Sequence, residues 1–235
     1  MEKKTLVLSS VIIAAGIAIL GYFISSGLSE IAGRDRVVTV KGLSEMVIPA
    51  DKVTWPIVSK EIGNDLPALY DRINDKTQII RDFLISGGLK PEDINVNAPE
   101  VIDLNAERYS DNGRNYRYNI TSVITVTSNN VKLVRSIISR QGELLKKGVA
   151  IVNGGYENPI TYEYTAFKDE KSKMMAEAIE NAEKTARQFA ENSHSRLNKI
   201  EKASQGQFTI ENKDETTPYI KKVRVVTTIT YSLKD

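Results

Sequence analysis

Cysteine is absent from this chain of 235 residues, and histidine occurs only once, as His194. Without cysteine the chain has no disulfide, no thiolate nucleophile and no cysteine ligand for a metal. One imidazole is a poor metal site, and a nucleophilic triad would depend on it alone. Its position between two serines at a polar helix end favours a contact with the helix dipole. We therefore expect no catalytic residue, no cofactor and no metal, and predict that the protein is not an enzyme.

An excess of positive or negative charge is also lacking. The 32 lysines and arginines are balanced by 30 aspartates and glutamates, and no long acidic or basic run occurs. Nucleic-acid-binding proteins cluster positive charge on one face, so the balance predicts no nucleic-acid partner. The 41% of hydrophobic and 26% of charged residues are typical of a globular protein with one substantial core or two small ones.

Charge is missing altogether from residues 5–27, whose apolar run LVLSSVIIAAGIAILGYFISSG follows Lys3 and Lys4. Roughly 20 apolar residues span a bilayer, whereas the apolar part of a secretory signal has roughly 7 to 15. No Ala-x-Ala cleavage site ends the run, so we favour an uncleaved signal anchor over a cleaved signal. The predicted organisation is a transmembrane helix at 1–29, a connector at 30–35 and a folded domain at 36–235 outside the cytoplasm.

The clearest helical pattern runs from Asp169 to Asn192. Two acid-first charge pairs at i,i+4 spacing, Glu180–Lys184 and Glu183–Arg187, indicate a solvated face and not a paired-carboxylate active site. The opposite face is mostly alanine, so the helix backbone can approach a sheet closely. The side chains predicted to be buried on this face are Met175, Ala178, Ile179, Ala182, Ala186, Phe189 and Ala190.

Alternating apolar and polar residues predict strands around two further helices, at 64–86 and 129–145. Gln141-Gly142 predicts a kink or an early end in the second of these helices. Asn112-Gly113 is a strong hairpin signal between two alternating runs. Together the segments predict an α+β fold, in which antiparallel β-hairpins are covered by helices on one face, in two similar halves.

Each of the notable aromatic residues could either contact a ligand or pack within the fold. Trp55 could stack on a ligand, but it shares a strand face with Val53 and Ile57, so packing in the core is favoured. Tyrosines at alternating strand positions can line a ligand groove or cover a sheet beneath a helix, and the second arrangement is the more common one. The tyrosines concerned are Tyr116, Tyr118, Tyr162 and Tyr164.

Three motifs resemble those of one family. VVTVKGLSEMVIPADKV at 37–53, GLKPEDINV at 88–96 and AEAIENAEKTARQFAENSHSRLNKIEKAS at 176–204 are similar to successive motifs of SIMPL-domain proteins, bacterial envelope proteins that include outer-membrane immunogenic proteins. Ala50 replaces an aspartate that is often found there, with Asp51 next to it. The resemblance implies a secreted or membrane-anchored α+β protein with no agreed enzymatic activity. It also implies that some relatives assemble into large, ring-like homo-oligomers.

We therefore expect a non-catalytic protein of the bacterial cell envelope, anchored in the inner membrane with its folded domain in the periplasm. It would self-assemble into a homo-oligomer, such as a ring, with a scaffold or envelope-stress role. The alternatives are a monomeric, tethered module that binds a ligand or partner, and a hydrolase, for which no acid–base pair is found. A cleaved signal would instead release the protein into the periplasm. The polar hairpin tip supplies the candidate oligomer contacts, namely Tyr109, Asp111, Asn112, Gly113, Arg114 and Tyr116.

Overall fold

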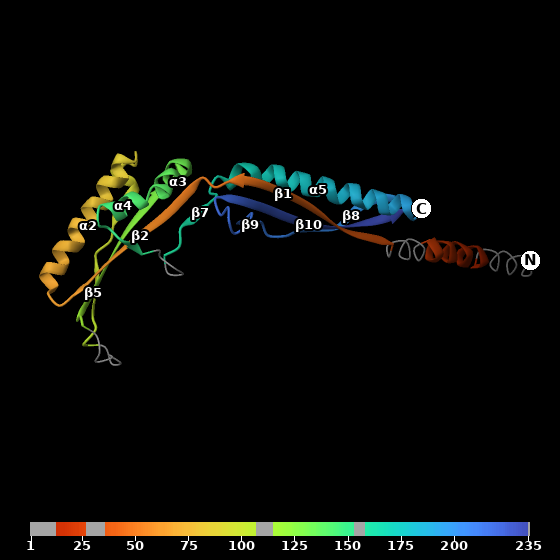
Figure 1. Ribbon diagram of the computed structural model, residues 1–235. Helices are drawn as coiled ribbons and strands as arrows, with labels where there is room; N and C mark the ends of the chain where they lie inside the picture. Colours follow the sequence, from red (N-terminus) through yellow and green to blue (C-terminus); the bar gives the residue numbers. More distant parts are fainter. Residues whose placement is uncertain (1–12, 27–35, 107–114, 153–157, 235) are drawn as a thin grey trace, which may run out of the picture. The chain divides into compact units, whose positions relative to one another are not determined.

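The computed structural model describes the chain in four stretches, residues 13–26, 36–106, 115–152 and 158–234. Its internal contacts divide the chain into two compact units: unit 1 comprises Met1–Glu45, Glu170–Thr209 and Arg224–Asp235, and unit 2 comprises Met46–Asp169 and Ile210–Val223. Each unit contains an antiparallel sheet with helical cover, which confirms the predicted α+β class (Figure 1). The segments of the two units alternate along the chain, so neither unit is one continuous half of the sequence.

The sheet of unit 1 has the strand order β1–β10–β8, and β9 also pairs with β10. Helix α5 follows this sheet along its length (Figure 1). β1 and β10 are antiparallel, because the Leu233 N–H, near the end of β10, donates to the carbonyl of Arg36, just before β1 (2.8 Å). The bounds are β1 Val37–Pro49, α5 Phe167–Asn192, β8 Arg196–Gln205, β9 Thr209–Asn212 and β10 Ile220–Lys234.

Helix α5 meets the sheet through a narrow stripe of small side chains. The buried residues recur every four positions, as Met174, Ala178, Ala182, Ala186 and Ala190. The helix lies so close to β1 that a β-carbon at Gly42 would stand 2.8 Å from the β-carbon of Ala182. The prediction that Met175, Ile179 and Phe189 are buried was wrong: Met175 is only partly buried, while Ile179 is 39% and Phe189 57% exposed. At this short separation the sheet covers only those side chains that point straight at it.

The sheet of unit 2 has the order β3–β5–β2–β6, with β4 also paired to β5 and β7 to β2. Its core holds large side chains from α2, α3 and α4 against β2 and β5, among them Trp55, Ile57, Phe83, Leu84, Ile124 and Ile137. The strands are β2 Lys52–Gly63, β3 Ile94–Val96, β4 Glu100–Asp103, β5 Tyr118–Ser128, β6 Ile151–Val152 and β7 Thr161–Glu163. The helices are α2 Leu66–Ser86, α3 Val131–Ser139 and α4 Gly142–Lys146.

Local sequence signals set the ends of the unit 2 helices. Asp65 caps α2 by accepting a hydrogen bond from the Ala68 N–H (3.2 Å), which satisfies a donor that has no partner within the helix. The predicted kink is confirmed, because α3 ends before Arg140 and α4 starts at Gly142. Trp55 is 2% exposed in the core, which confirms that interpretation as well.

The predicted transmembrane helix at 1–29 is not supported. Residues 13–26 are helical and exposed. Among the helices that the structure describes, none combines the length and apolar character required to cross a membrane. Residues 1–12 and 27–29 lie outside the described residues.

Candidate functional site

The only histidine of the sequence, His194, lies just beyond the end of helix α5. His194 follows the helix with a left-handed φ of 56°, is exposed, and donates its N–H to the Glu191 carbonyl (3.0 Å). This places it at the helix end, as predicted. In the part of the chain that the structure describes, no group of three or more His, Asp or Glu residues could hold a metal ion.

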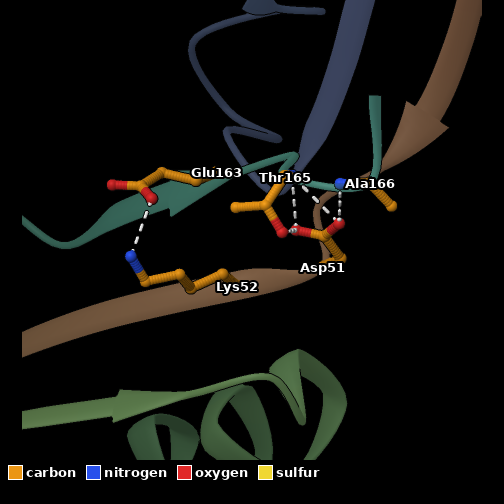
Figure 2. A network of polar contacts seen from close by, with 5 residues as sticks. All are labelled: Asp51, Lys52, Glu163, Thr165 and Ala166. Atoms are coloured by element: carbon orange, nitrogen blue, oxygen red, sulfur yellow. Dashed lines mark hydrogen bonds and ion pairs between the residues drawn. The ribbon is translucent and has the colours of Figure 1, made fainter. Parts of the chain in front are cut away.

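A dense polar network surrounds Asp51, in the turn between β1 and β2 (Figure 2). Its carboxylate accepts hydrogen bonds from the Thr165 N–H (2.8 and 2.9 Å), the Thr165 hydroxyl (3.1 Å) and the Ala166 N–H (2.8 Å). The Asp51 N–H in turn donates to the Glu163 carbonyl (2.9 Å). Lys52 forms an ion pair with the Glu163 carboxylate at 3.0 Å. The network therefore joins the β1–β2 turn to the segment that leads from β7 into α5.

The electrostatics of Asp51 favour a structural role over catalysis. Burial by itself would raise the pKa of this carboxyl, but the hydrogen bonds from Thr165 and Ala166 outweigh burial and lower the pKa. A carboxylate with these donors is a weak base and stays ionised. Burial would raise the pKa of Glu61 as well, but its contacts with Lys76 and Arg72 outweigh burial and lower the pKa. Both acids therefore hold structure together and neither is poised to transfer a proton near neutral pH.

Our sequence reasoning assigned no role to Asp51. The aspartate lies in the motif at 37–53, next to Ala50. Its partners at 165 and 166 are more than a hundred residues away in the chain. An acidic residue in a turn that offers it no nearby hydrogen-bond donor indicates a partner elsewhere in the chain. The sequence pattern does not identify which distant residue that partner is.

The predicted contact hairpin has a firmly held base. Asp103 at the end of β4 forms a bidentate ion pair with Arg117, from Nε to Oδ1 (3.1 Å) and from Nη2 to Oδ2 (2.7 Å). The Arg117 side chain also lies over the Tyr118 ring at 4.9 Å. Asn64 accepts from the Arg117 N–H (2.8 Å) and donates to the Asn115 carbonyl (3.2 Å). The side-chain hydrogen bonding of Arg117 to Asp103 lowers the pKa of that acid. These contacts fix both chain segments where they enter the tip.

Of the predicted oligomer contacts, the structure describes only Tyr116, which is 38% exposed. Tyr109, Asp111, Asn112, Gly113 and Arg114 lie outside the described residues. The antiparallel pairing of Asp103 with Tyr118 confirms that β4 and β5 form a hairpin around this segment.

The other tyrosines do not gather into one groove. Tyr118 packs beside the small apolar cluster of α2 and β5. Tyr162 packs against the main core of unit 2, and its ring meets that of Tyr219 edge-on at 6.1 Å between centroids. Tyr164 is exposed. The interpretation that tyrosines cover a sheet therefore holds for Tyr118 and Tyr162.

A groove that sequence reasoning missed lies in unit 1, between the C-terminal half of α5 and the start of β8. Its volume is about 360 Å³, and its lining includes Glu183, Arg187, Ser195, Arg196, Leu197 and Tyr231. Arg187 and Glu183 form an ion pair within it (2.6 Å). Burial raises the pKa of Tyr231 at its floor. The groove thus offers both charge signs around a partly apolar floor.

These features define an α+β protein built from two units, each with an antiparallel sheet and helical cover, and with acids engaged in structural contacts. The family model SIMPL, described as a protein of unknown function (DUF541), matches residues 38–231, and the chain belongs to this family. A search of curated proteins found no match.

Proposed function

We propose that this SIMPL protein is a non-catalytic, membrane-anchored component of the bacterial envelope that self-assembles and acts as a scaffold, with a role in envelope stress. The folded part would lie in the periplasm. Anchoring in the inner membrane rests on the apolar run at 5–27, and the large homo-oligomer, such as a ring, rests on the family resemblance. Release into the periplasm after cleavage is the alternative location.

The observation that carries the proposal is the clamped base of the 105–116 hairpin. Asp103 with Arg117, and Asn64 with Asn115, hold both sides of a polar tip next to the exposed ring of Tyr116. A hairpin whose base is already held in place loses less conformational entropy at that base when it docks. The arrangement therefore supports a role for the tip in subunit contact.

Light scattering on the purified full-length chain tests the proposal. We expect a discrete assembly of several chains, and a smaller mass for Tyr116→Ser. Tyr70→Ser is the matched control, since Tyr70 is 50% exposed on α2 and lies in no proposed contact. A monomer at every concentration would remove the assembly proposal.

The groove of unit 1 supports a second candidate, a tethered module that binds a small ligand. Its volume of about 360 Å³ is within the range of small-molecule sites. Arg187 and Glu183 would suit a ligand that carries both charges. A ligand screen by thermal shift on wild type and Arg196→Ala tests this candidate; equal shifts in both would count against it.

A further inference from the structure

The two outer strands of the unit 1 sheet, β1 and β8, differ in how well they resist pairing with a strand of another chain. β8 has register shifts against β10 on both sides of the pair Tyr231–Ile200, and it carries Lys199 and Lys202. Bulges and lysines are devices that keep an edge strand from pairing with another chain. β1 is longer, at 13 residues, and rich in valine. Its cross-strand contacts to β10 at Arg36, Thr39 and Glu45 all keep one register, so this part of β1 has no bulge.

The outward backbone groups of β1 can be assigned from its contacts. The Arg36 carbonyl points to β10, since it accepts from the Leu233 N–H. In an antiparallel pair, alternate residues direct their backbone groups to the partner strand. The odd-numbered residues of β1 therefore direct theirs away from β10. Leu43 agrees, because its carbonyl accepts from the side chain of Asn181 on α5 (2.9 Å).

The side chains of these odd-numbered residues lie on the face of the sheet opposite α5 and are exposed, Val37 by 47% and Leu43 by 39%. Lys41 and Glu45 stand two positions on either side of Leu43. If a second β1 pairs antiparallel about Leu43, each Lys41 lies opposite a Glu45. Opposite charges at directly paired positions stabilise a sheet, and this register makes the contact twice.

Helix α5 also carries two residues that the same two-fold axis would bring opposite each other. The residue just before each member of its buried stripe lies on the β1 side. The Asn181 side chain donates a hydrogen bond to the Leu43 carbonyl, and the Ser44 hydroxyl donates one to the Glu177 carboxylate. This row continues to Lys173 in one direction and to Phe189, 57% exposed, in the other. Because Asn181 lies at the level of Leu43, a two-fold axis there brings Lys173 opposite Phe189 of the second copy. A lysine over an aromatic ring is an attractive pair.

We propose that β1 pairs with β1 of a second copy of this chain, antiparallel about a two-fold axis at Leu43. The proposal rests on the self-assembly in the proposed function and assigns its surface. The two sheets become one, with both α5 helices on the same face. Such an interface is self-complementary and closes at two copies, so a larger assembly needs another contact, such as the hairpin tip.

Charge reversal gives a test that depends on the register. Lys41→Glu alone and Glu45→Lys alone place like charges opposite each other twice, and we expect each to raise the dissociation constant of the dimer about tenfold or more. Mixing the two variants restores both opposite-charge pairs in the heterodimer, so the mixture should associate as tightly as wild type. Both side chains are exposed, and circular dichroism of each full-length variant checks its fold.

A cross-link provides the second measurement, because the chain has no cysteine of its own. Leu43→Cys should form a disulfide-linked dimer under mild oxidation, since hydrogen-bonded strand pairs hold their α-carbons about 5.5 Å apart. Ser204→Cys on β8 is the exposed control and should not cross-link. Assembly that is unchanged by either charge reversal, together with no cross-link in the Leu43→Cys variant, would overturn this interface alone. A full-length chain that is always monomeric would overturn both the interface and the proposed assembly.

Discussion

In unit 1, α5 meets its sheet through Ala178, Ala182 and Ala186, whereas in unit 2 the helices meet theirs through residues such as Phe83 and Ile137. The first contact depends on close approach of two backbones, and the second on the volume of large side chains. Added volume should therefore damage unit 1, and removed volume should damage unit 2. This difference also explains why the exposed apolar residues of α5 are free to serve in contacts with another chain.

The largest expected effect is the removal of volume from unit 2. Ile80→Ala deletes a fully buried side chain, and we expect a loss of about 2–5 kcal/mol in the free energy of unfolding. Denaturation followed by the fluorescence of Trp55, the one tryptophan, reports on this unit. Ile179→Ala on α5 is the control and should cost far less, because Ile179 is 39% exposed. Equal losses would contradict the proposed difference between the units.

The next effect is the addition of volume to unit 1. Gly42→Ala places a β-carbon 2.6 Å from the Ala182 nitrogen, so α5 must move away from the sheet. Overpacking of this kind costs about 1–3 kcal/mol. Thermal unfolding by circular dichroism measures it. Gly142→Ala is the matched control, with open space around its new β-carbon, and a similar loss there would show that the helix–sheet contact is not the cause.

A smaller effect on stability is expected at Asp51. Its hydrogen-bond network lies wholly in unit 2 and joins the turn after β1 to the segment just before α5. Asp51→Asn keeps the size but loses charge-assisted acceptors, at a cost of about 1–2 kcal/mol. Asp214→Asn is the control, because Asp214 bonds only to Thr216 and Thr217 within its own loop.

The same variant predicts a pH dependence. Folding lowers the pKa of Asp51, so its stabilising contribution is complete above the unfolded pKa of about 3.9 and is lost as the pH falls through the folded pKa. The difference in Tm between wild type and Asp51→Asn should therefore shrink below about pH 4. A difference that stays constant down to pH 2 would refute this assignment.

The smallest effect on stability is expected at the hairpin base. Asp103→Asn removes a partly exposed ion pair, and solvent screens such pairs, so the free energy of unfolding should fall only slightly. If the base presents the tip, the variant should nevertheless reduce the mass of the assembly measured by light scattering. An unchanged mass would show that the clamp has no part in subunit contact.

The ends of the helices and the break between α3 and α4 could be predicted because their causes are local. Asp65 caps a donor three residues away, and Gln141-Gly142 interrupts a helical pattern within its own turn. The buried face of α5 was predicted less well. Its hydrophobic spacing admits Ile179 and Phe189, and only the distance to Gly42 shows how narrow the covered stripe is. The network of Asp51 was missed because it joins segments that lie far apart in the chain. The groove beside β8 was missed because Tyr231, from a distant strand, completes its lining.

Residue type and short-range spacing were enough to predict the α+β class, the family motifs and the approximate ends of α2 and α5, and to exclude cysteine chemistry. Three features became apparent only from the fold: the segments of the two units alternate along the chain, Asp51 accepts hydrogen bonds from Thr165 and Ala166, and β1 is a smooth edge while β8 is a bulged one. These features arise from pairing between distant segments, where the register of one strand on another sets which side chains and backbone groups face outward.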